Sequence, residues 1–389
     1  CMSVCMYVCM YVCMYVYMYQ RCGSIENSWK TFERIAQPDE VSWTATISAF
    51  VQHNKHRQAL HLYKLMLEEG LKPSKVSLAC VVDACANSES LSEGMIMHSC
   101  MIDFDIKTDM QLDNSFLKLY SLCGSLEDAE ILFDSLQYSD RVSWGAIIAG
   151  SVQHGKSHNA LELFSKMAKK GIEPDKITFL SLLKACGSIV AIQEGRLIHD
   201  QIIRKGLKSD VIVGNALIDM YIKCGSLEEA RAVFNKLDKR VVVSWGVMIS
   251  GYAQFERITC ALKLLCEMHS ENIEADNVTY LCILSACSKM GALKQGRLMH
   301  DQLMKSKYPC DVSISNALIG MYAECGMLED ACNVFNILSD QDATSWGALI
   351  AGCAENGYEF LALKLFFKMH ERDLIPEKAI VVCVLSACS

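Results

Sequence analysis

The sequence predicts an all-α fold, an α-solenoid in which helix-turn-helix repeats stack into a superhelix. The main evidence is a repeat of 101 residues, marked by four tryptophans that each lie 101 residues after the one before: Trp43, Trp144, Trp245 and Trp346. Nearly the same letters surround them, as in RVSWGAIIAG at 141–150 and ATSWGALIAG at 343–352. Hydrophobic residues make up 51% of the 389 residues and proline occurs only 5 times, which favours packed helices over disorder.

Each period of 101 residues divides into repeat units of 35, 35 and 31 residues, and each unit is predicted to form two short helices. The unit that holds the tryptophan covers 40–74, 141–175, 242–276 and 343–377. The second covers 75–109, 176–210 and 277–311, and the third covers 110–140, 211–241 and 312–342. A degenerate third unit at 9–39 precedes them, and a truncated second unit fills 378–389. Neither helix of a unit can bury its apolar stripe alone, so the units must stack.

The twentieth residue of each unit predicts how closely the helices pack. It is alanine or glycine throughout, namely Ala59, Ala160, Ala261, Ala362, Ala129, Ala230, Ala331, Gly94, Gly195 and Gly296. So small a side chain lets the second helix of a unit cross the first at close range. The tryptophan, among valine and isoleucine neighbours, is predicted to pack at the junction between units rather than to stack on a ligand.

The two ends of the chain depart from this pattern. Residues 1–17 are a low-complexity tract in which Cys-Met-Tyr-Val recurs. A tandem repeat of the tetranucleotide TGTA encodes these four residues, so we expect the segment to be artefactual or degenerate. A membrane-inserting segment is the alternative, and the tract lacks the arginines of a transit peptide. The repeat array covers 18–389 and stops within a unit, so the chain is expected to be truncated.

Composition excludes several classes of protein. The formal net charge of −8 counts against bulk electrostatic binding to nucleic acid, although a local polar groove stays compatible with it. The 21 cysteines include no CxxC pair, so we interpret them as small buried residues in a reducing compartment. No metal site and no cofactor are predicted, and no apolar stretch after the first twenty residues is long enough to span a membrane.

The units resemble pentatricopeptide repeats. The resemblance lies in sequence segments such as VVSWGVMISGYAQ, LLKACGSIVAIQEGRLIHDQIIRKGLKSD and NALIDMYIKCGSLEEARAVF. The alternation of 35, 35 and 31 residues resembles the PLS arrangement (P, L and S units in that order) of land-plant organelle proteins. The resemblance implies single-stranded organellar RNA as the partner, with one nucleotide for each repeat. It also implies a monomer located in a mitochondrion or chloroplast.

In this family the fifth residue of the first helix and the last residue of the repeat read a base edge. The resemblance therefore implies the base-reading pairs Asn114 with Asp140, Asn215 with Val241, Asn316 with Asp342, and Thr44 with Ser74. Asn with Asp resembles the family's uridine combination, Asn with Val favours a pyrimidine, and Thr with Ser resembles a purine combination. An asparagine offers both a donor and an acceptor to a base. The alternative role for the three asparagines is to cap the start of a helix.

Other repeats match the family pattern less well. Glycine cannot read a base, so poor discrimination is expected from Gly145 with Asp175, Gly246 with Asp276, and Gly347 with Glu377. The L units carry Ala79, Leu180 and Leu281 at the fifth position, which cannot form hydrogen bonds with a base either. Aliphatic residues at the second position are implied to pack against base faces, namely Val41, Val142, Val243 and Ile212.

No enzyme is predicted. His269-Ser270-Glu271 spells the HxE motif of zinc deaminases, but no CxxC pair completes it. A role in C-to-U editing would therefore be that of a specificity factor, with a deaminase supplied by editing-complex proteins. His154 and His158 flank a predicted turn. His98, His199 and His300 share one repeat position, which favours a structural or groove-lining role over catalysis. Two alternatives stay open, a peptide-binding helical scaffold and a non-functional fragment of a larger gene.

Overall fold

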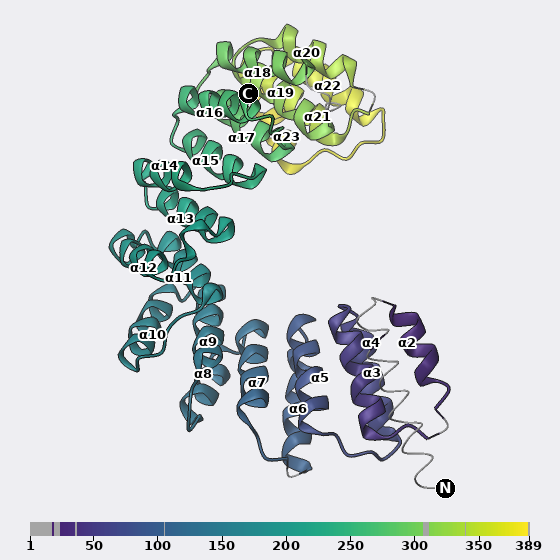
Figure 1. Ribbon diagram of the computed structural model, residues 1–389. Coiled ribbons are helices and arrows are strands. Elements are labelled where there is room, and N and C mark those ends of the chain that lie inside the picture. The colour runs from purple at the N-terminus through teal and green to yellow at the C-terminus, as the bar shows by residue number, and fades with distance from the viewer. Residues whose placement is uncertain are drawn as a thin grey trace. The chain divides into compact units, whose positions relative to one another are not determined.

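The computed structural model describes Met18 and residues 24–35, 37–104, 106–305, 311–338 and 340–387. These residues form 22 α-helices and one short 3-10 helix, and none of them lies in a strand (Figure 1). The predicted all-α fold of stacked helix pairs is confirmed. The predicted tract at 1–17 and most of the predicted first helix of the 9–39 unit lie outside the described residues.

The chain has two compact parts, residues 1–198 and 199–389. The first holds α2 (Ile25–Phe32), α3 (Glu40–Gln52), α4 (His56–Glu68), α5 (Lys75–Asn87), α6 (Leu91–Asp103), α7 (Met110–Cys123), α8 (Leu126–Ser135), α9 (Arg141–Gln153), α10 (Ser157–Lys169) and α11 (Lys176–Ser188). Helix α12 (Ile192–Arg204) runs from the first part into the second. The second then holds α13 (Val211–Lys223), α14 (Leu227–Lys236), α15 (Val242–Gln254), α16 (Ile258–Ser270), α17 (Asn277–Lys289), α18 (Leu293–Lys305), α19 (Val312–Glu324), α20 (Leu328–Ile337), α21 (Ala343–Glu355), α22 (Glu359–His370) and α23 (Lys378–Ala387).

Both parts are built from two layers of helices. In the first part, α3, α5, α7, α9 and α11 follow one another side by side, each in contact with the next (Figure 1). In the second part, α13, α15, α17, α19, α21 and α23 form the same kind of row. We call these the first helices. The second helices α4, α6, α8, α10, α14, α16, α18, α20 and α22 pack on the first helix that precedes each of them in the chain and on the one that follows, as α4 does with α3 and α5.

The tryptophans lie at the junctions between helix pairs, as predicted. All four are at most 3% exposed. Each ring packs edge-on against a phenylalanine of the preceding second helix, with ring centroids 4.7–4.8 Å apart: Trp43 on Phe32, Trp144 on Phe133, Trp245 on Phe234 and Trp346 on Phe335. Such pairs add to the stability that the buried area itself provides. The tryptophan therefore joins one helix pair to the next.

The small residues at the twentieth position are buried, and at two of them the nearest atoms belong to the following helix pair. A Cβ atom on Gly94 of α6 would lie 2.2 Å from Leu119 of α7, and one on Gly296 of α18 would lie 2.4 Å from Met321 of α19. The closest atoms at these two positions belong to the first helix of the following pair, while α6 and α18 also contact α5 and α17 of their own pairs. The seven alanines at this position are fully buried: Ala59, Ala129, Ala160, Ala230, Ala261, Ala331 and Ala362.

The second helices differ in length, and lengths of 10 and 13 residues recur among them. Helices α8, α14 and α20 have 10 residues, whereas α4, α6, α10, α12, α16 and α18 have 13. A difference of three residues is close to one helical turn. The first helices α3, α5, α9, α11, α13, α15, α17, α19 and α21 all have 13 residues. The helix pairs that contain α8, α14 and α20 therefore have a second helix that is about one turn shorter, whereas their first helix is not shortened.

A histidine links α6, α12 and α18 to the first helix that follows each of them. The Nδ1 atoms of His98, His199 and His300 lie 2.6, 2.8 and 2.9 Å from the hydroxyl oxygens of Tyr120, Tyr221 and Tyr322, respectively. Burial lowers the pKa of all three histidines from the ordinary value of 6.5, although neighbouring carboxylates act in the opposite direction. These contacts agree with the structural role predicted for this repeat position.

Replacement of one junction tryptophan should destabilise the protein strongly. We expect Trp245→Ala to lower the free energy of unfolding by about 3–5 kcal/mol, because it leaves a cavity against Phe234. Val243→Ala, two residues earlier at an exposed position, is the control and should change stability by less than about 0.5 kcal/mol. Urea unfolding followed by circular dichroism compares the two, and similar losses would contradict the packing role.

The three histidines should make stability depend on pH. Their lowered pKa means that the folded state resists protonation, so the unfolded state binds more protons as the pH falls below 6.5. Stability from this source is fully present above 6.5 and is lost as the pH falls through the folded-state pKa. Urea unfolding at about pH 7.5 and about pH 5 should show a smaller loss in a triple His→Gln variant than in the natural chain. An equal loss in both chains would exclude these histidines as the cause.

Candidate nucleic-acid interface

The N-terminal turns of the first helices carry a row of exposed aliphatic side chains. The predicted base-packing residues Val41, Val142, Ile212 and Val243 are the second residues of their helices and are 56–59% exposed. Three residues that the sequence analysis did not name share this position: Val76, Ile177 and Val278, which are 55–66% exposed. Their position in the repeat could have identified them. Single exposed aliphatic side chains are common on protein surfaces, so it is their recurrence at one position of the helix that sets these residues apart.

Asn114 and Asp140 are brought together, and a third residue joins them. Asn114 is the fifth residue of α7, and its Nδ2 donates to Asp140 Oδ1 at 3.3 Å. Asp140 is the N-cap of α9 and accepts from the Ser143 amide at 2.9 Å. The Ser143 hydroxyl lies 2.6 Å from Asn114 Oδ1 and 2.9 Å from Asp140 Oδ1, so its proton can reach either acceptor. The last residue of one helix pair thus meets the fifth residue of that pair and the third residue of the next.

The same arrangement recurs at Asn316. Its Nδ2 donates to Asp342 Oδ1 at 3.2 Å, and the Ser345 hydroxyl donates to its Oδ1 at 2.5 Å. Asp342 caps α21 and accepts from the Ser345 amide at 2.7 Å. A carboxylate only accepts hydrogen bonds, so the asparagine NH2 must face it. One N–H and one lone pair of each amide then stay available to a ligand.

The alternative role of these asparagines, capping the helix start, is wrong. The N-cap residues of α7, α13 and α19 are Asp109, Asp210 and Asp311, which lie five residues before Asn114, Asn215 and Asn316. Capping belongs instead to the last residue of the preceding unit, a role that the sequence analysis did not assign. An aspartate before a helix is a common capping signal and could have shown it.

Hydrogen bonding lowers the pKa of two capping carboxylates, Asp140 and Asp342. Burial favours the protonated form of Asp140, but hydrogen bonds from the Ser143 amide and hydroxyl and from Asn114 outweigh it and lower the pKa of the carboxyl. Asp342 has a lowered pKa for the same reasons, with Ser345 and Asn316 as donors. Both groups therefore carry a negative charge at neutral pH.

Asn215 lacks this partner, because the last residue of its pair is Val241. The backbone of Val241 accepts from the Ser244 amide at 2.9 Å, and no side chain caps α15. The Oδ1 atom of Asn215 is buried and has no hydrogen-bond partner among the described residues. The structure therefore places Asn215 as it places the other two asparagines but leaves its amide less firmly held.

Thr44 and Ser74 are not brought together by a hydrogen bond within the described residues. The Thr44 hydroxyl donates to Glu40, one turn earlier in α3, at 3.5 Å. Ser74 caps α5 through the Ser77 amide at 3.3 Å. Thr44 and Ser74, the pair predicted to favour a purine, thus bond to different partners and not to each other.

The glycines at the fifth position lie close to a side chain of the next first helix. A Cβ atom on Gly145 or Gly246 would lie 3.1 Å from the hydroxyl oxygen of Thr178 or Thr279, respectively. Asp175 and Asp276, the last residues of these pairs, cap α11 and α17 through the same threonines. At Gly347 the nearest atom is Cδ1 of Ile380, at 2.7 Å, and Glu377 directly precedes α23.

Residues of the HxE motif and of the histidine pair form other contacts. Glu271 of the HxE motif forms an ion pair with Arg240 at 2.9 Å, and His154 lies 2.9 Å from the Ser121 carbonyl oxygen. The described residues bring no three His, Cys, Asp or Glu side chains into a metal-binding group. Within the same ranges, no helix combines the length and apolar character needed to cross a bilayer.

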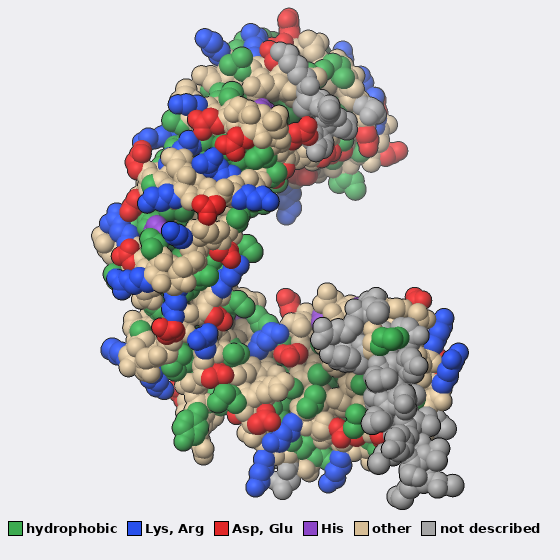
Figure 2. Space-filling model, in the orientation of Figure 1, with side chains coloured by type: hydrophobic (Ala, Val, Ile, Leu, Met, Phe, Trp, Pro, Cys, Tyr) green, Lys and Arg blue, Asp and Glu red, His purple; other side chains and the backbone are tan. Residues whose placement is uncertain are grey.

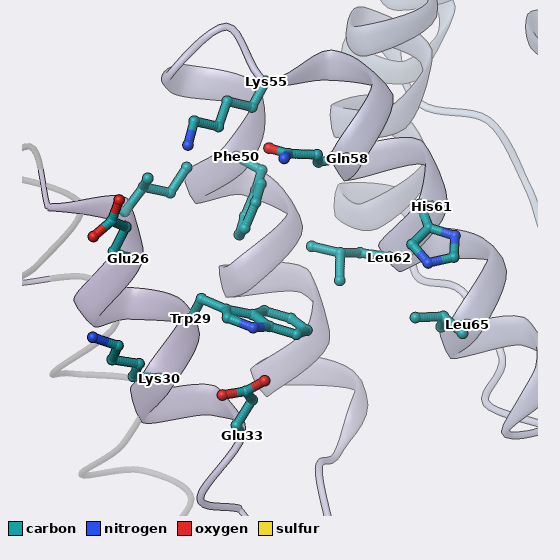
Figure 3. A pocket seen from close by; sticks show the side chains of 11 residues that line it. Glu26, Trp29, Lys30, Glu33, Phe50, Lys55, Gln58, His61, Leu62 and Leu65 are labelled. Carbon is teal, nitrogen blue, oxygen red and sulfur yellow. The ribbon is translucent and has the colours of Figure 1, made fainter.

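The surface carries side chains of both charges, and a pocket lies between helices near the start of the described chain. Basic and acidic side chains are interspersed on the face that Figure 2 shows. A pocket of about 450 Å³ lies between α2, α3 and α4, with Trp29, Phe50 and Leu62 inside it and Glu26 and Lys55 at its rim (Figure 3). None of its lining residues is the second or fifth residue of a first helix, so this pocket is separate from the row of exposed aliphatic side chains.

The fold and the recurring contacts between fifth and last residues define a helical-repeat protein. Two family descriptions match the chain: "PPR repeat family" over 38–87, 139–188 and 240–289, and "PPR repeat" over 215–241, 313–340 and 344–374. The chain belongs to the pentatricopeptide repeat family.

Similar curated proteins carry the family name. A chloroplastic pentatricopeptide repeat-containing protein of Arabidopsis thaliana is 32% identical over 369 residues, covering 95% of this chain and 46% of the relative. A putative mitochondrial one from the same plant is 33% identical over 371 residues, covering 95% of this chain and 61% of the relative. The chain spans about half the length of the curated relatives it matches.

Solved structures agree with the fold. The crystal structure of the pentatricopeptide repeat protein PPR10 from maize matches with a TM-score of 0.73 at 19% identity, covering 97% of this chain and 56% of that one. Yeast Rmd9p, solved in complex with a 16-nucleotide target RNA, matches with a TM-score of 0.51 at 11% identity, covering 94% and 88%. At these identities the likeness concerns the fold alone.

A carboxylate at residue 241 should stabilise the protein. We expect Val241→Asp to raise the free energy of unfolding by about 1 kcal/mol, because it supplies the missing N-cap of α15 and a partner for Asn215. Val241→Ala is the control, since alanine cannot cap. Urea unfolding of both variants tests this, and equal stabilities would argue that the site cannot accept the carboxylate in the geometry of Asp140.

Proposed function

We propose that this protein binds single-stranded RNA along its first helices, with one base at each helix pair, and takes part in RNA processing in a mitochondrion or chloroplast. Three observations support the proposal: membership of the pentatricopeptide repeat family, a fold shared with Rmd9p in its RNA complex, and the recurring contacts at Asn114 and Asn316. The organelle follows from the names of the chloroplastic and mitochondrial relatives.

The proposed repeats are the P, L and S units of the sequence analysis. First helices begin at residues 40, 75, 110, 141, 176, 211, 242, 277, 312, 343 and 378, which are the first residues of those units. The 10-residue second helices lie in the S units. This correspondence supports a PLS array, in which each first helix presents its second and fifth residues to one nucleotide.

We assign the base preferences from the contacts. Asn114 with Asp140 and Asn316 with Asp342 select uridine, because the held amide offers a donor and an acceptor to the base edge. Asn215 with Val241 prefers a pyrimidine less strictly. The exposed aliphatic side chains at the second position pack against base faces. Thr44 and Ser74 favour a purine weakly, and a glycine at the fifth position adds no hydrogen bond of its own.

The target and the outcome of binding belong to the same proposal. The protein acts as a monomer and selects an organellar transcript, and editing-complex proteins supply a deaminase if the outcome is C-to-U editing. The competing function is a peptide-binding scaffold, which the exposed aliphatic row and the net charge of −8 favour. The polar contacts at Asn114 and Asn316 favour RNA, since a base edge matches an amide and an apolar peptide face does not.

Removal of one amide should relax selectivity at one nucleotide. Asn114→Ala should lower discrimination between uridine and a purine at that site by about 1–3 kcal/mol and leave the other sites unchanged. Fluorescence anisotropy at one salt concentration, with uridine-periodic RNAs changed to purine at single positions, measures the effect.

The matched control is Asn215→Ala, which removes an asparagine without a carboxylate partner and should have a smaller effect. Circular dichroism checks that both variants stay folded, which is expected because neither residue caps a helix. Equal affinity of the natural chain for uridine-periodic and purine-substituted RNA would overturn base reading. Binding of apolar peptides in place of RNA would support the scaffold function.

A further inference from the structure

Helix α22 exposes two aromatic side chains at positions where its three counterparts carry polar or small residues. The counterparts are α4, α10 and α16, which likewise follow a first helix that bears a tryptophan. The second and ninth residues of all four helices are exposed: Arg57 and Lys64, His158 and Ser165, Thr259 and Cys266, and Phe360 and Phe367. Phe360 is 82% exposed and Phe367 is 62% exposed.

The two phenylalanines lie on one face of α22, because residues seven apart are separated by about two helical turns. Leu363 lies between them at the i+3 position and is partly exposed. We call Phe360, Leu363 and Phe367 the outer stripe. Ala362 and Met369 are buried on the opposite side, where α22 packs on α21 and α23 (Figure 1). Helix α22 is therefore apolar on two sides, and one of them faces solvent.

The neighbouring helix pair does not cover this face. In α4, α10 and α16 the second and ninth residues stay exposed, although a complete helix pair follows each of these helices in the chain. Single exposed apolar side chains are common on protein surfaces. Two large ones on one helix face, at positions that are polar or small in the counterparts, instead indicate a contact with another molecule.

Two lysines make the outer stripe basic. Lys364 lies between Phe360 and Phe367 on the same face, one turn from each, and Lys368 directly follows Phe367. Both lysines are exposed, and neither forms an ion pair with another described residue. The acidic residues of α22 lie at its two ends, as its first residue and its C-cap. A complementary surface therefore has apolar side chains with carboxylates between them.

An α-helix can supply that surface. An amphipathic helix repeats its apolar residues at i, i+3, i+4 and i+7, which is the spacing of Phe360, Leu363 and Phe367. Charged residues that flank the apolar contacts of two paired helices select the partner through ion pairs. The two lysines therefore favour a helix with acidic residues beside its apolar stripe.

We propose that the outer stripe is a docking site for an acidic amphipathic helix of a partner protein. Phe360, Leu363 and Phe367 are its apolar anchors, and Lys364 and Lys368 pair with carboxylates of the partner. The site lies on a second helix, whereas the proposed RNA binding uses the second and fifth residues of the first helices. The inference goes beyond the proposed function and does not depend on it.

The test measures binding of the full chain to fluorescein-labelled helical peptides by fluorescence anisotropy. The acidic peptide carries two leucines seven residues apart, with two glutamates between them on the same face. A second peptide has lysines in place of the glutamates, and a third has alanines in place of the leucines. The acidic peptide should bind about tenfold more tightly than either of the others. Equal binding of all three, or no binding of the acidic peptide, would overturn the proposal.

Two double variants use residues that the counterpart helices carry at the same positions, and circular dichroism checks that both stay folded. Phe360→Thr with Phe367→Ser should weaken binding of the acidic peptide by about tenfold. Lys364→Glu with Lys368→Glu should reverse the preference, so that the basic peptide binds more tightly. Phe255→Ser is the control, because it removes an exposed phenylalanine outside the outer stripe and should leave peptide binding unchanged.

Other occupants of this face would give different results, and each of them would overturn the proposal. Self-association of the natural chain that is lost in the phenylalanine variant would assign the face to a second copy of the chain. Loss of binding to vesicles of anionic phospholipid would assign it to a membrane surface, and weakened RNA binding would assign it to RNA. If no chain binds RNA while the peptide preferences hold, the proposed function is overturned and the docking site stands.

Discussion

A side chain at the end of one helix pair caps the first helix of the next, and the arrangement of the first-helix surface depends on that hydrogen bond. Asp39, Asp140, Asp175, Asp276 and Asp342 each accept from a backbone amide three residues later, at 2.7–2.9 Å. The first turn of a helix has amides without intrahelical partners, so the cap satisfies a need of the fold itself. It also holds a carboxylate beside the fifth residue of the preceding first helix. The same side chain therefore caps one helix and, at Asp140 and Asp342, contacts the fifth residue of another.

Because the last residue of a helix pair both caps a helix and contacts the fifth residue, its substitution affects both interactions. Where the last residue is Val241, the backbone carbonyl replaces the side chain as acceptor, and the neighbouring Asn215 loses its partner. Where the fifth residue is glycine, the cap persists and only the contact to the fifth residue disappears. The fifth residue can thus change without cost to the helix start, whereas the last residue cannot.

Much of the fold could be predicted from the sequence, because it depends on periodic apolar residues. The 101-residue recurrence of tryptophan predicts buried junctions, and each ring packs on a phenylalanine of the preceding helix. The site was harder to predict, since the roles of its polar residues depend on neighbours in other helices. The hydroxyl of Ser143 and the close approach of Gly94 to Leu119 both cross from one helix pair to the next, so spacing within a repeat carries no trace of them. The capping role of Asp140, in contrast, was readable from its place before a helix.

The 10-residue second helices have a consequence for how such chains can vary in length. Because the missing turn lies in α8, α14 and α20, the succession of first helices continues past them: α7 still contacts α9, and α13 still contacts α15. Insertions or deletions of a turn can therefore accumulate on one side of the array while the opposite side keeps its order. The length of a repeat can therefore change without a change in the order of the first helices.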